Sequence, residues 1–394
     1  MARIVIAGAG YAGMMAATGL DHISEPFTLV NNQEYHYFTT LLHEAVGSRA
    51  SPMNYTVPIR TVLRQDTSQL VVDEVVSLNR ERRILQGRQG EYPYDYLILS
   101  LGWIPEYFGI PGMKEHSLVL RNIGTALQIR RHIEQQFRMY TQTGEKKFLR
   151  IVVGGGGLTG IELMGELLEW LPQLCAKYDI PWSEVDLQNI EALPTILPQM
   201  DPSLREVATQ TLIQKGARLR THTKLVRVEE GTVYLEGGEV VKSATLIWTG
   251  GVRANPLLTE SGFTVDGHGR ARVNEYLQSV DDERVFVGGD CAWAEDDQGE
   301  RLPPTAQVAI QMGHWLAHNV VSAVHGEAMQ TFHANFQGTL ASLGSEVGVG
   351  NVGKIPVRGV LAGWIKEATQ LKYLWELGGL RLAVDKTGEL IHLF

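Results

Sequence analysis

Two glycine-rich segments carry the residues with the clearest chemistry in this sequence. Gly8–Gly13 follows the apolar run Ile4–Ala7, and Gly155–Gly160 follows the apolar run Ile151–Val153. In this pattern a short strand turns into a helix through glycines, so that backbone N–H groups and the helix N-terminus face the pyrophosphate of a dinucleotide. One such segment alone is weak evidence. Two of them, separated by the length of a domain, predict that two dinucleotides are held at once and exchange electrons.

Polar residues stand at strand ends where sugar hydroxyls would be bound. Asn31 occupies the position at which an acid commonly contacts the ribose of the first dinucleotide, and its amide could do the same. Glu191 ends the strand after the second glycine segment, where a carboxylate binds both ribose hydroxyls and repels a 2′-phosphate, which favours NADH over NADPH. A solvated acid is the alternative for Glu191. Asp290, beside Gly289 after an apolar strand, could accept a hydrogen bond from the ribityl chain of a flavin.

Glu162 is a candidate for proton transfer. It lies near the start of the helix after the second glycine segment, where a carboxylate could steer a nicotinamide and assist the protonation of a reduced acceptor. Alternatively it only complements the helix dipole. Glu166 and Glu169 continue the same helical face and are expected to be ordinary polar residues.

A glutamine pair suggests a site for a neutral acceptor. Gln307 and Gln311 are four residues apart in a helix that Thr305 is expected to cap. Their amides carry no charge and suit the carbonyl groups of a quinone, although such a pair is usually solvated. The start of this helix could also stabilise negative charge on a reduced flavin.

The elements that position these residues follow an α/β pattern. We expect apolar strands at Phe27–Val30, Tyr96–Ser100 and Ala244–Trp248, and an amphipathic helix at Asn122–Tyr140. The strand predicted at Arg284–Val287 is expected to return to the sheet of the first glycine segment. The second dinucleotide-binding domain is therefore predicted to be inserted in the first.

Composition excludes several classes of function. The chain has 394 residues and a formal net charge of −9, which argues against nucleic acid as a partner. Its two cysteines, Cys175 and Cys291, are far apart, which argues against a redox disulfide beside a flavin and favours reduced, buried thiols. No metal-ligand cluster is visible. No run approaches the ~18 apolar residues of a membrane span, so we expect a chain that is cytoplasmic or peripheral to a membrane.

The C-terminal segment is predicted to form an amphipathic helix. Its apolar residues recur at helical spacing, with tryptophans among them, which is consistent with a helix lying in a membrane interface. A helix that packs in the core or forms a dimer is the alternative. The apolar residues are Leu361, Trp364, Ile365, Ala368, Leu371, Leu374 and Trp375.

Taken together, these segments resemble the type II NADH:quinone oxidoreductases over nearly the whole chain. The Ala-Gln-x-Ala-x-Gln pattern is specific to the quinone site of that family, whereas the glycine segments fit any flavoprotein with two dinucleotides. The segments that carry the resemblance are Gly8–Gly13, Glu34–Tyr37, Gly155–Glu162, Trp248–Arg253, Gly289–Cys291 and Ala306–Gln311.

The resemblance implies an α/β fold of the FAD/NAD(P)-linked reductase type. It has two Rossmann-like domains, the second inserted in the first, and a C-terminal membrane-associated segment. We expect an FAD-binding domain at 1–120 and 271–345, an NADH-binding domain at 121–270, and a segment for membrane attachment and dimerisation at 346–394. One non-covalent FAD per subunit, a homodimer and peripheral, monotopic attachment to the cytoplasmic face of the cell membrane are also implied.

Site residues follow by position in the family's motifs. Glu162 matches the proposed catalytic carboxylate, and Gln307 and Gln311 match the quinone site. The residues expected to contact NADH are Gly155, Gly157, Gly160, Glu191 and Gly250. The residues expected to contact FAD are Gly8, Ala9, Gly10, Tyr11, Ala12, Asn31, Asn32, Val75, Asp290, Ala306, Gln307 and Lys366.

The predicted function is non-proton-pumping NADH:quinone oxidoreduction, with menaquinone or ubiquinone as acceptor. The alternatives are a sulfide:quinone oxidoreductase, a soluble NADH-dependent flavoprotein reductase of a small electron-carrier protein, and a redox-sensing scaffold. The first needs cysteines near the flavin, and the second would lack the quinone motif and the amphipathic C-terminus.

Overall fold

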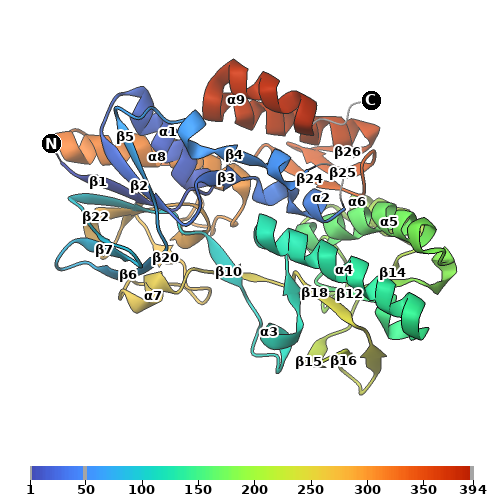
Figure 1. Cartoon of the computed structure of the whole chain (residues 1–394). Helices are drawn as coiled ribbons and strands as arrows, with labels where there is room; N and C mark the ends of the chain where they lie inside the picture. Colours follow the sequence, from blue (N-terminus) through green and yellow to red (C-terminus); the bar gives the residue numbers. More distant parts are fainter. Residues whose placement is uncertain (1, 48–50, 391–394) are drawn as a thin grey trace. The chain divides into compact units, whose positions relative to one another are not determined.

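The computed structural model describes residues 2–47 and 51–390 (Figure 1). Contacts within the chain divide it into two compact units, each assembled from three separate stretches of sequence. The first unit contains Met1–Tyr37, Thr56–Ile104 and Val252–Phe336, and the second contains Phe38–Tyr55, Pro105–Gly251 and Gln337–Phe394. The two units are defined by contacts within the chain and not by where ligands bind, so the domain boundaries predicted above remain a functional proposal.

A six-stranded sheet forms the centre of the first unit, in the order β21-β22-β9-β1-β2-β5. Its strands run parallel except β21, which pairs antiparallel with β22. β1 is buried along its whole length, which is typical of a parallel strand whose sheet is covered on both faces. The strands are β1 (Ile4–Ala7), β2 (Phe27–Asn31), β5 (Ser68–Val72), β9 (Tyr96–Leu99), β21 (Gln278–Ser279) and β22 (Asp282–Val287).

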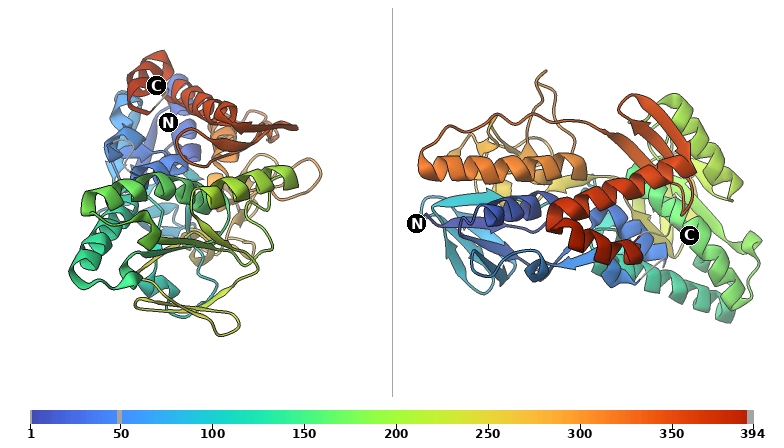
Figure 2. Two further views of the ribbon diagram at one scale, coloured as in Figure 1. Left: turned by 90° about the vertical axis from the view of Figure 1, so that its right-hand side faces the viewer. Right: turned by 90° about the horizontal axis from the view of Figure 1, so that it is seen from above.

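The predicted return of the chain to this sheet is confirmed, because β22 pairs with β9 in parallel, with Val285 opposite Leu97. Two helices pack against each other in this unit, α1 (Tyr11–His22) and α8 (Ala306–His325), and Figure 2 shows them side by side. The remaining elements are short: β3 (Tyr35–Tyr37), β4 (Thr56–Pro58), β6 (Val75–Asn79), β7 (Ile84–Gly87), β8 (Glu91–Pro93), β10 (Trp103–Pro105, whose last residue belongs to the second unit), β19 (Val252–Ala254), α7 (Leu257–Glu260), β20 (Ala271–Arg272) and β23 (Ala292–Trp293).

A second parallel sheet, of five strands, forms the centre of the second unit in the order β11-β18-β12-β13-β14. Its strands are β11 (Leu118–Val119), β12 (Arg150–Gly154), β13 (Asp186–Ile190), β14 (Arg218–Arg220) and β18 (Thr245–Trp248). The helices beside it are α2 (Leu42–Gly47), α3 (Met113–His116), α4 (Ile123–Thr143), α5 (Leu158–Tyr178) and α6 (Pro202–Gln214), and an antiparallel sheet comprises β15 (Leu225–Glu229), β16 (Thr232–Leu235) and β17 (Val240–Lys242).

The helix predicted at Asn122–Tyr140 is confirmed as α4, and its start shows how the sequence fixes it. The side chain of Asn122 accepts a hydrogen bond from the Thr125 backbone N–H at 2.9 Å, and the Asn122 backbone N–H donates one to the Thr125 hydroxyl oxygen at 3.0 Å. This reciprocal pair satisfies amides that the first helical turn leaves without partners. The apolar stripe predicted for this helix is buried in the second unit, at Ala126, Ile129, Ile133 and Phe137.

The C-terminal part of the second unit is a three-stranded antiparallel sheet followed by one long helix. The strands are β24 (Gly338–Ser342), β25 (Gly348–Val352) and β26 (Ile355–Gly359), and the helix is α9 (Val360–Leu390). α9 bends at Gly378 and Gly379, whose backbone angles are not helical. Among the described residues, no helix is both long enough and apolar enough to cross a bilayer.

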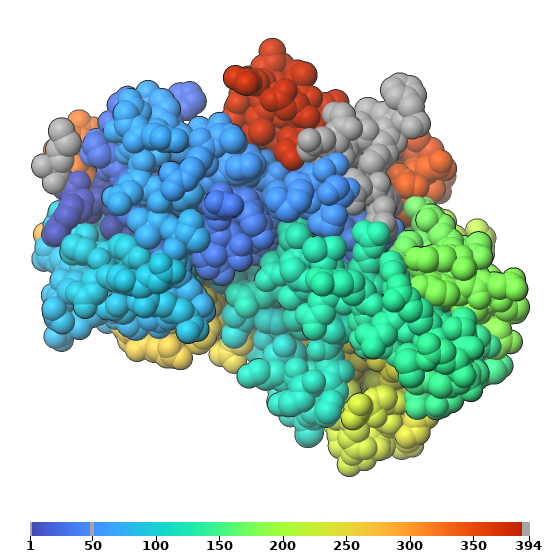
Figure 3. All heavy atoms as spheres, viewed as in Figure 1, coloured from blue at the N-terminus to red at the C-terminus, as the bar shows by residue number. Residues whose placement is uncertain are grey.

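The predicted apolar stripe of α9 divides between two environments. Leu361, Trp364 and Trp375 are more than half exposed, and Figure 3 shows this helix, in red, at the molecular surface. Leu374, in contrast, is buried against the unit. Beyond the bend, Leu380 and Val384 extend the exposed apolar surface. The helix therefore both packs inward and presents large apolar side chains outward.

Candidate functional site

The first glycine segment forms a tight loop between β1 and α1. Gly8 has a φ of +99°, and a methyl group there would overlap the carbonyl oxygen of Ser100. A methyl group at Gly13 would overlap the carbonyl oxygen of Gly8, so the helix begins directly against the loop. Gly10 is the N-cap and no side chain caps the helix, which leaves its first N–H groups available to an anion.

Asn31, at the end of β2, contacts this loop directly. Its Oδ1 accepts a hydrogen bond from the Ala9 backbone N–H at 3.0 Å, and its Nδ2 donates to the Gln33 carbonyl at 2.8 Å. Asn31 is thus placed where it was predicted, beside the first glycine segment, and it also shapes that segment. Asn32 follows it and is exposed, and Val75 is half-buried at the first residue of β6.

The turn that carries Asp290 packs against both helices of the first unit. A methyl group at Gly289 would lie 3.3 Å from Cβ of Ala12 in α1 and 3.8 Å from Cβ of Ala309 in α8. Three predicted flavin-binding segments, distant in sequence, are therefore neighbours: Gly8–Ala12, Asp290 and the start of α8. Asp290 is half-buried on this turn. Desolvation of its carboxyl group by the packed elements raises the pKa of Asp290 to about 6, against a smaller opposing effect of Arg270.

The helix predicted after Thr305 is confirmed as α8, with the Thr305 side chain accepting from the Val308 N–H at 3.3 Å. Ala306, Gln307 and Gln311 are half-buried in it. The side-chain amide of Gln311 is hydrogen-bonded to backbone groups. Its Nε2 donates to the carbonyls of Gln307 at 3.1 Å and Asn335 at 3.0 Å, and its Oε1 accepts from the Asn335 N–H at 2.8 Å. No local sequence pattern predicts this contact.

The second glycine segment repeats the geometry of the first between β12 and α5. Gly155 has a φ of +108° and lies against Gly250, and Gly157 is the N-cap without a side-chain cap. A methyl group at Gly160 would overlap the Gly155 carbonyl oxygen. Four of the five residues predicted to contact NADH are thus grouped at one end of the sheet in the second unit.

Glu191, the fifth, is buried at the end of β13. Its Oε2 accepts from the Gly156 N–H at 2.5 Å and its Oε1 accepts from the Leu193 N–H at 2.7 Å. Its distance in sequence from Gly160 is long because α5 continues through Pro172 to Tyr178 before the chain turns back into β13.

Glu162 and Lys366 form an ion pair within the second unit. Lys366 Nζ donates to Glu162 Oε1 and, at 2.9 Å, to the Ser342 hydroxyl, and both charged side chains are nearly buried. The Ser342 backbone N–H also donates to Glu162 Oε1 at 3.2 Å. Lys366 was assigned by resemblance to the flavin, and this direct partnership with Glu162 was not expected.

The expectation for Glu166 is wrong. It is only 1% exposed, because α5 is covered by other helices and by β24 along the face where a solvated residue was predicted. Glu169 is half-buried and accepts from Lys215 Nζ at 3.0 Å and from the Ser345 N–H. An i, i+4 pattern identifies a shared face, but not whether that face meets water.

Two buried histidines were not predicted to belong to a site. His36, in the Glu34–Tyr37 segment, is buried, and its Nδ1 lies 2.8 Å from the Ala9 carbonyl oxygen. Burial lowers the pKa of His36 to about 4, so the ring is neutral and its Nδ1–H donates to the first glycine segment. His43 in α2 is also buried and lies beside Glu162. Only the motif around His36 offered a signal.

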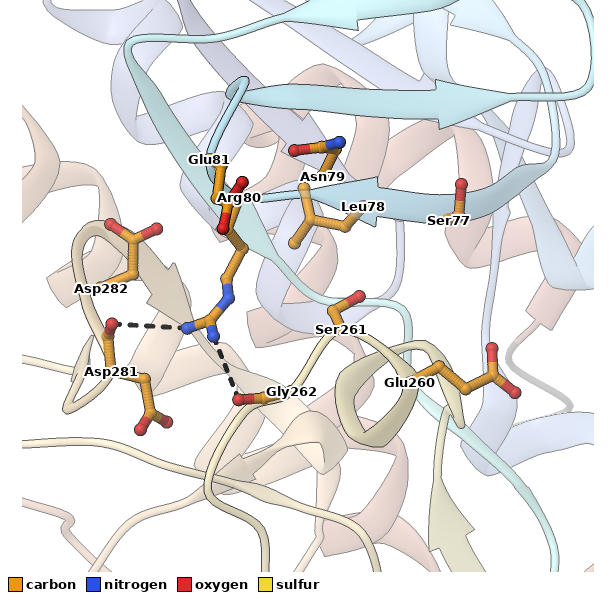
Figure 4. A pocket seen from close by; sticks show the side chains of 10 residues that line it. All are labelled: Ser77, Leu78, Asn79, Arg80, Glu81, Glu260, Ser261, Gly262, Asp281 and Asp282. Carbon is orange, nitrogen blue, oxygen red and sulfur yellow. Dashed lines mark hydrogen bonds between the residues drawn. The ribbon is translucent and has the colours of Figure 1, made fainter.

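An open hollow of about 750 Å³ lies elsewhere in the first unit, on residues that no prediction named (Figure 4). Arg80 crosses it and donates to the carbonyls of Gly262 at 3.1 Å and Asp281 at 3.4 Å. Figure 4 shows its lining of polar and acidic side chains. Its residues are Ser77, Leu78, Asn79, Arg80, Glu81, Glu260, Ser261, Gly262, Asp281 and Asp282.

Comparison with known proteins identifies the family. Residues 2–313 match the family described as pyridine nucleotide-disulphide oxidoreductase. The chain is 35% identical over 394 residues to a type II NADH:quinone oxidoreductase of Staphylococcus aureus and 36% identical to that of Staphylococcus epidermidis, with 98% of each chain covered. The chain belongs to the type II NADH:quinone oxidoreductase family. The family, fold class and enzyme class predicted from the sequence are thereby confirmed.

A solved structure supports the fold of this type II NADH:quinone oxidoreductase family member. The structure of NDH2 from Plasmodium falciparum in complex with NADH matches it with a TM-score of 0.87 at 18% identity, covering 99% of this chain and 98% of that one. The family description mentions a disulphide, but Cys175 and Cys291 are both free and buried here, as predicted.

Proposed function

We propose that this protein oxidises NADH and reduces a membrane quinone, with one non-covalently bound FAD per subunit. The observation that carries the proposal is the paired construction of the two glycine segments. In each, a strand-end side chain accepts a hydrogen bond from the second residue of the loop, Asn31 from Ala9 and Glu191 from Gly156. FAD, when bound, accepts a hydride from NADH and passes two electrons to the quinone.

The first unit offers a site that suits FAD. The glycine loop approaches too closely for side chains at Gly8 and Gly13, and leaves the N–H groups of Tyr11 and Ala12 for the pyrophosphate. Asp290 supplies a carboxyl group for the ribityl hydroxyls. Such hydrogen bonds would offset the cost of ionising this carboxyl group in a packed environment.

The second unit offers a matching site for NADH. Glu191 already binds backbone N–H groups through one hydrogen bond at each oxygen, and each oxygen has a further lone pair for a ribose hydroxyl. A 2′-phosphate would meet a buried carboxylate, so NADH is preferred over NADPH. Gly155, Gly160 and Gly250 are too closely packed to carry side chains, and Gly157 is the N-cap of α5, so these four glycines are proposed to form the floor of this site.

The quinone is proposed to bind at the start of α8. Gln307 presents an amide there, while Gln311 holds the segment around Asn335 in place. Glu162 is proposed to assist proton transfer, since its buried carboxylate is held by the charge of Lys366.

We further propose that the C-terminal segment, residues 346–394, attaches the protein to the cytoplasmic face of the cell membrane and contributes to a homodimer. The exposed side chains of Leu361, Trp364, Trp375, Leu380 and Val384 support this, because large apolar and aromatic residues on one helix favour an interfacial position. Within the proposed division, residues 1–120 and 271–345 bind FAD and residues 121–270 bind NADH.

The visible spectrum of the purified protein, followed by stopped-flow mixing, tests the proposal. We expect a flavin spectrum that NADH bleaches rapidly and a quinone then restores. Protein that stays colourless after incubation with FAD would contradict the proposal. Bleaching that no quinone reverses would favour a carrier-protein reductase instead.

A further inference from the structure

Ser100 and Thr249 stand at corresponding strand ends of the two units and contact the two glycine loops in the same way. Ser100 follows β9, which pairs with β1, and Thr249 follows β18, which pairs with β12. The backbone N–H and the hydroxyl of Ser100 both donate to the Ala7 carbonyl, at 2.9 and 3.1 Å. Those of Thr249 both donate to the Gly154 carbonyl, at 2.8 and 2.9 Å. Two residues distant in sequence thus repeat one arrangement.

Each hydroxyl also reaches the first glycine of its loop. Ser100 Oγ lies 2.9 Å from the Gly8 carbonyl oxygen, and Thr249 Oγ1 lies 3.3 Å from the Gly155 carbonyl oxygen. A hydroxyl has a single proton to donate, so this proton is shared between the carbonyl that ends the strand and the carbonyl that opens the loop. We call Ser100 and Thr249 the clamp residues.

The clamp residues also account for the third glycine of each loop. A methyl group at Gly13 would lie 2.5 Å from Ser100 Oγ, and a methyl group at Gly160 would lie 2.7 Å from Thr249 Oγ1. Both distances are shorter than van der Waals contact, so each helix begins directly against a clamp hydroxyl. The hydroxyl therefore lies where the strand end, the loop and the helix start meet.

The orientation of the loop peptides decides whether a loop attracts or repels a pyrophosphate. Backbone N–H groups attract the phosphate oxygens, whereas carbonyl oxygens carry a negative partial charge and repel them. A donor beneath the loop stabilises the orientation in which the Gly8 or Gly155 carbonyl is directed inward. Because a loop already held in this way has less freedom to lose on binding, a clamp residue raises affinity without touching the ligand.

The loop of the second unit has an additional donor. Asn189, in β13, is fully buried, and its Nδ2 donates to the Gly155 carbonyl at 2.9 Å and to the Val153 carbonyl at 3.1 Å. The Gly155 carbonyl therefore keeps a donor when the Thr249 hydroxyl is removed. We accordingly expect the loss of the Thr249 hydroxyl to have a smaller effect than the loss of the Ser100 hydroxyl.

We propose that Ser100 and Thr249 are positioning residues, Ser100 for the pyrophosphate of FAD and Thr249 for that of NADH. This inference rests on the proposed function, which assigns FAD to the first loop and NADH to the second. Each residue is assigned to one ligand because the hydrogen bonds of its hydroxyl go to one loop. A residue that only supported the fold would lower the stability of the protein without this selectivity.

Ser100→Ala tests the first assignment, with Ser279→Ala as the matched control. Ser279 is a buried serine of the same sheet, in β21, and its hydroxyl accepts a hydrogen bond from the Asp281 N–H. Titration of the FAD-free proteins with FAD, followed by flavin fluorescence, gives the Kd. We expect this Kd to rise on the order of tenfold in the Ser100 variant, because a buried carbonyl loses a donor. It should stay at the wild-type value in the Ser279 variant, and the KM for NADH of the FAD-loaded Ser100 variant should not change.

Thr249→Val tests the second assignment, with Thr245→Val as the matched control. Thr245 stands at the other end of β18, and its hydroxyl lies 3.1 Å from His132 Nε2. Thr249→Val should raise the calorimetric Kd for NAD⁺ and the KM for NADH about threefold, the smaller effect expected beside Asn189. FAD content and kcat should not change. Thr249→Ser restores the hydroxyl and should restore both constants, and Thr245→Val should leave them at the wild-type values.

The results distinguish positioning from support of the fold. Wild-type Kd values in Ser100→Ala and Thr249→Val would overturn the inference, as would an equal loss of affinity for both ligands in either variant. Lower melting temperatures with unchanged affinities would overturn it too, because the hydroxyls would then only stabilise the fold. If the wild-type protein itself binds neither FAD nor NAD⁺, the proposed function fails instead.

Discussion

Glu191 and Gly156 are joined by a hydrogen bond of 2.5 Å from the loop N–H to the carboxylate, so the residue predicted to recognise the nucleotide also holds the glycine loop in shape. These two roles separate in two substitutions. Glu191→Ala leaves the buried Gly156 N–H without its acceptor, a loss of about 1–3 kcal/mol. We expect the KM for NADH to rise on the order of tenfold.

Glu191→Gln keeps a carbonyl acceptor for Gly156 but removes the charge. We therefore expect a smaller rise in the KM for NADH and a clear loss of discrimination against NADPH, measured as the ratio of kcat/KM values. Equal discrimination in wild type and the Gln variant would assign the preference to another residue.

Glu162→Gln should slow turnover by about a hundredfold, because the amide cannot carry the proton and leaves Lys366 without its anionic partner. FAD content should not change. Glu169→Gln is the control, since Glu169 lies on the same helix and pairs with Lys215. Full activity in the Glu162 variant, or equal loss in both, would remove the assigned role.

Gln311→Leu should raise the apparent KM for quinone several-fold and leave bleaching by NADH unchanged. Because the side chain holds the backbone of Asn335 through two hydrogen bonds, cleavage by a protease near residues 331–337 should also become faster. His314→Gln, an exposed change in the same helix, serves as the control. Slower reduction of the flavin by NADH in the Gln311 variant would show that Gln311 does not act at the quinone site alone.

Asp290→Asn should stabilise the FAD-free protein while weakening FAD binding. The folded-state pKa of about 6 lies above the ordinary value, so the carboxyl group costs stability as the pH rises from about 4 towards 6, and that cost persists above pH 6. Two pKa units correspond to about 3 kcal/mol, and partial exposure reduces this to about 1–2 kcal/mol. Melting temperatures of both apoproteins should therefore differ at pH 7.5 and converge near pH 4; a constant difference would contradict this assignment.

Replacing Trp364 and Trp375 with serine should release the protein from membranes. Both side chains are more than half exposed, and neither is needed to fill the core. Co-sedimentation with vesicles of phosphatidylcholine and phosphatidylglycerol measures the effect, with exposed Ile23→Ser in the first unit as the control. Unaltered binding of the double variant would exclude this helix as the attachment site.

Much of the fold could be predicted because it depends on local signals. Local signals of this kind are the glycine segments, the cap at Thr305, and the apolar runs that form β1, β12, β18 and β22. Each determines its structure within a few residues. Continuous apolar runs are reliable here because parallel strands are covered on both faces.

The parts that escaped prediction depend on contacts between distant segments. Nothing near Gln311 indicates that its amide would bind Asn335, and nothing near His43 indicates Ser342 or Lys366. The burial of Glu166 likewise follows from what packs on α5. Periodicity identifies a helical face, whereas tertiary packing decides what that face contacts.

The bend at Gly378 and Gly379 marks where this protein could be shortened. Lys366 and the buried Tyr373, Leu374 and Leu377 all precede it, whereas the exposed Leu380 and Val384 follow it. A chain ending at the bend would keep Lys366, which pairs with Glu162, and would lose the exposed apolar side chains that follow the bend. Removal of all of α9, by contrast, would also remove Lys366 and leave the buried Glu162 without its cationic partner.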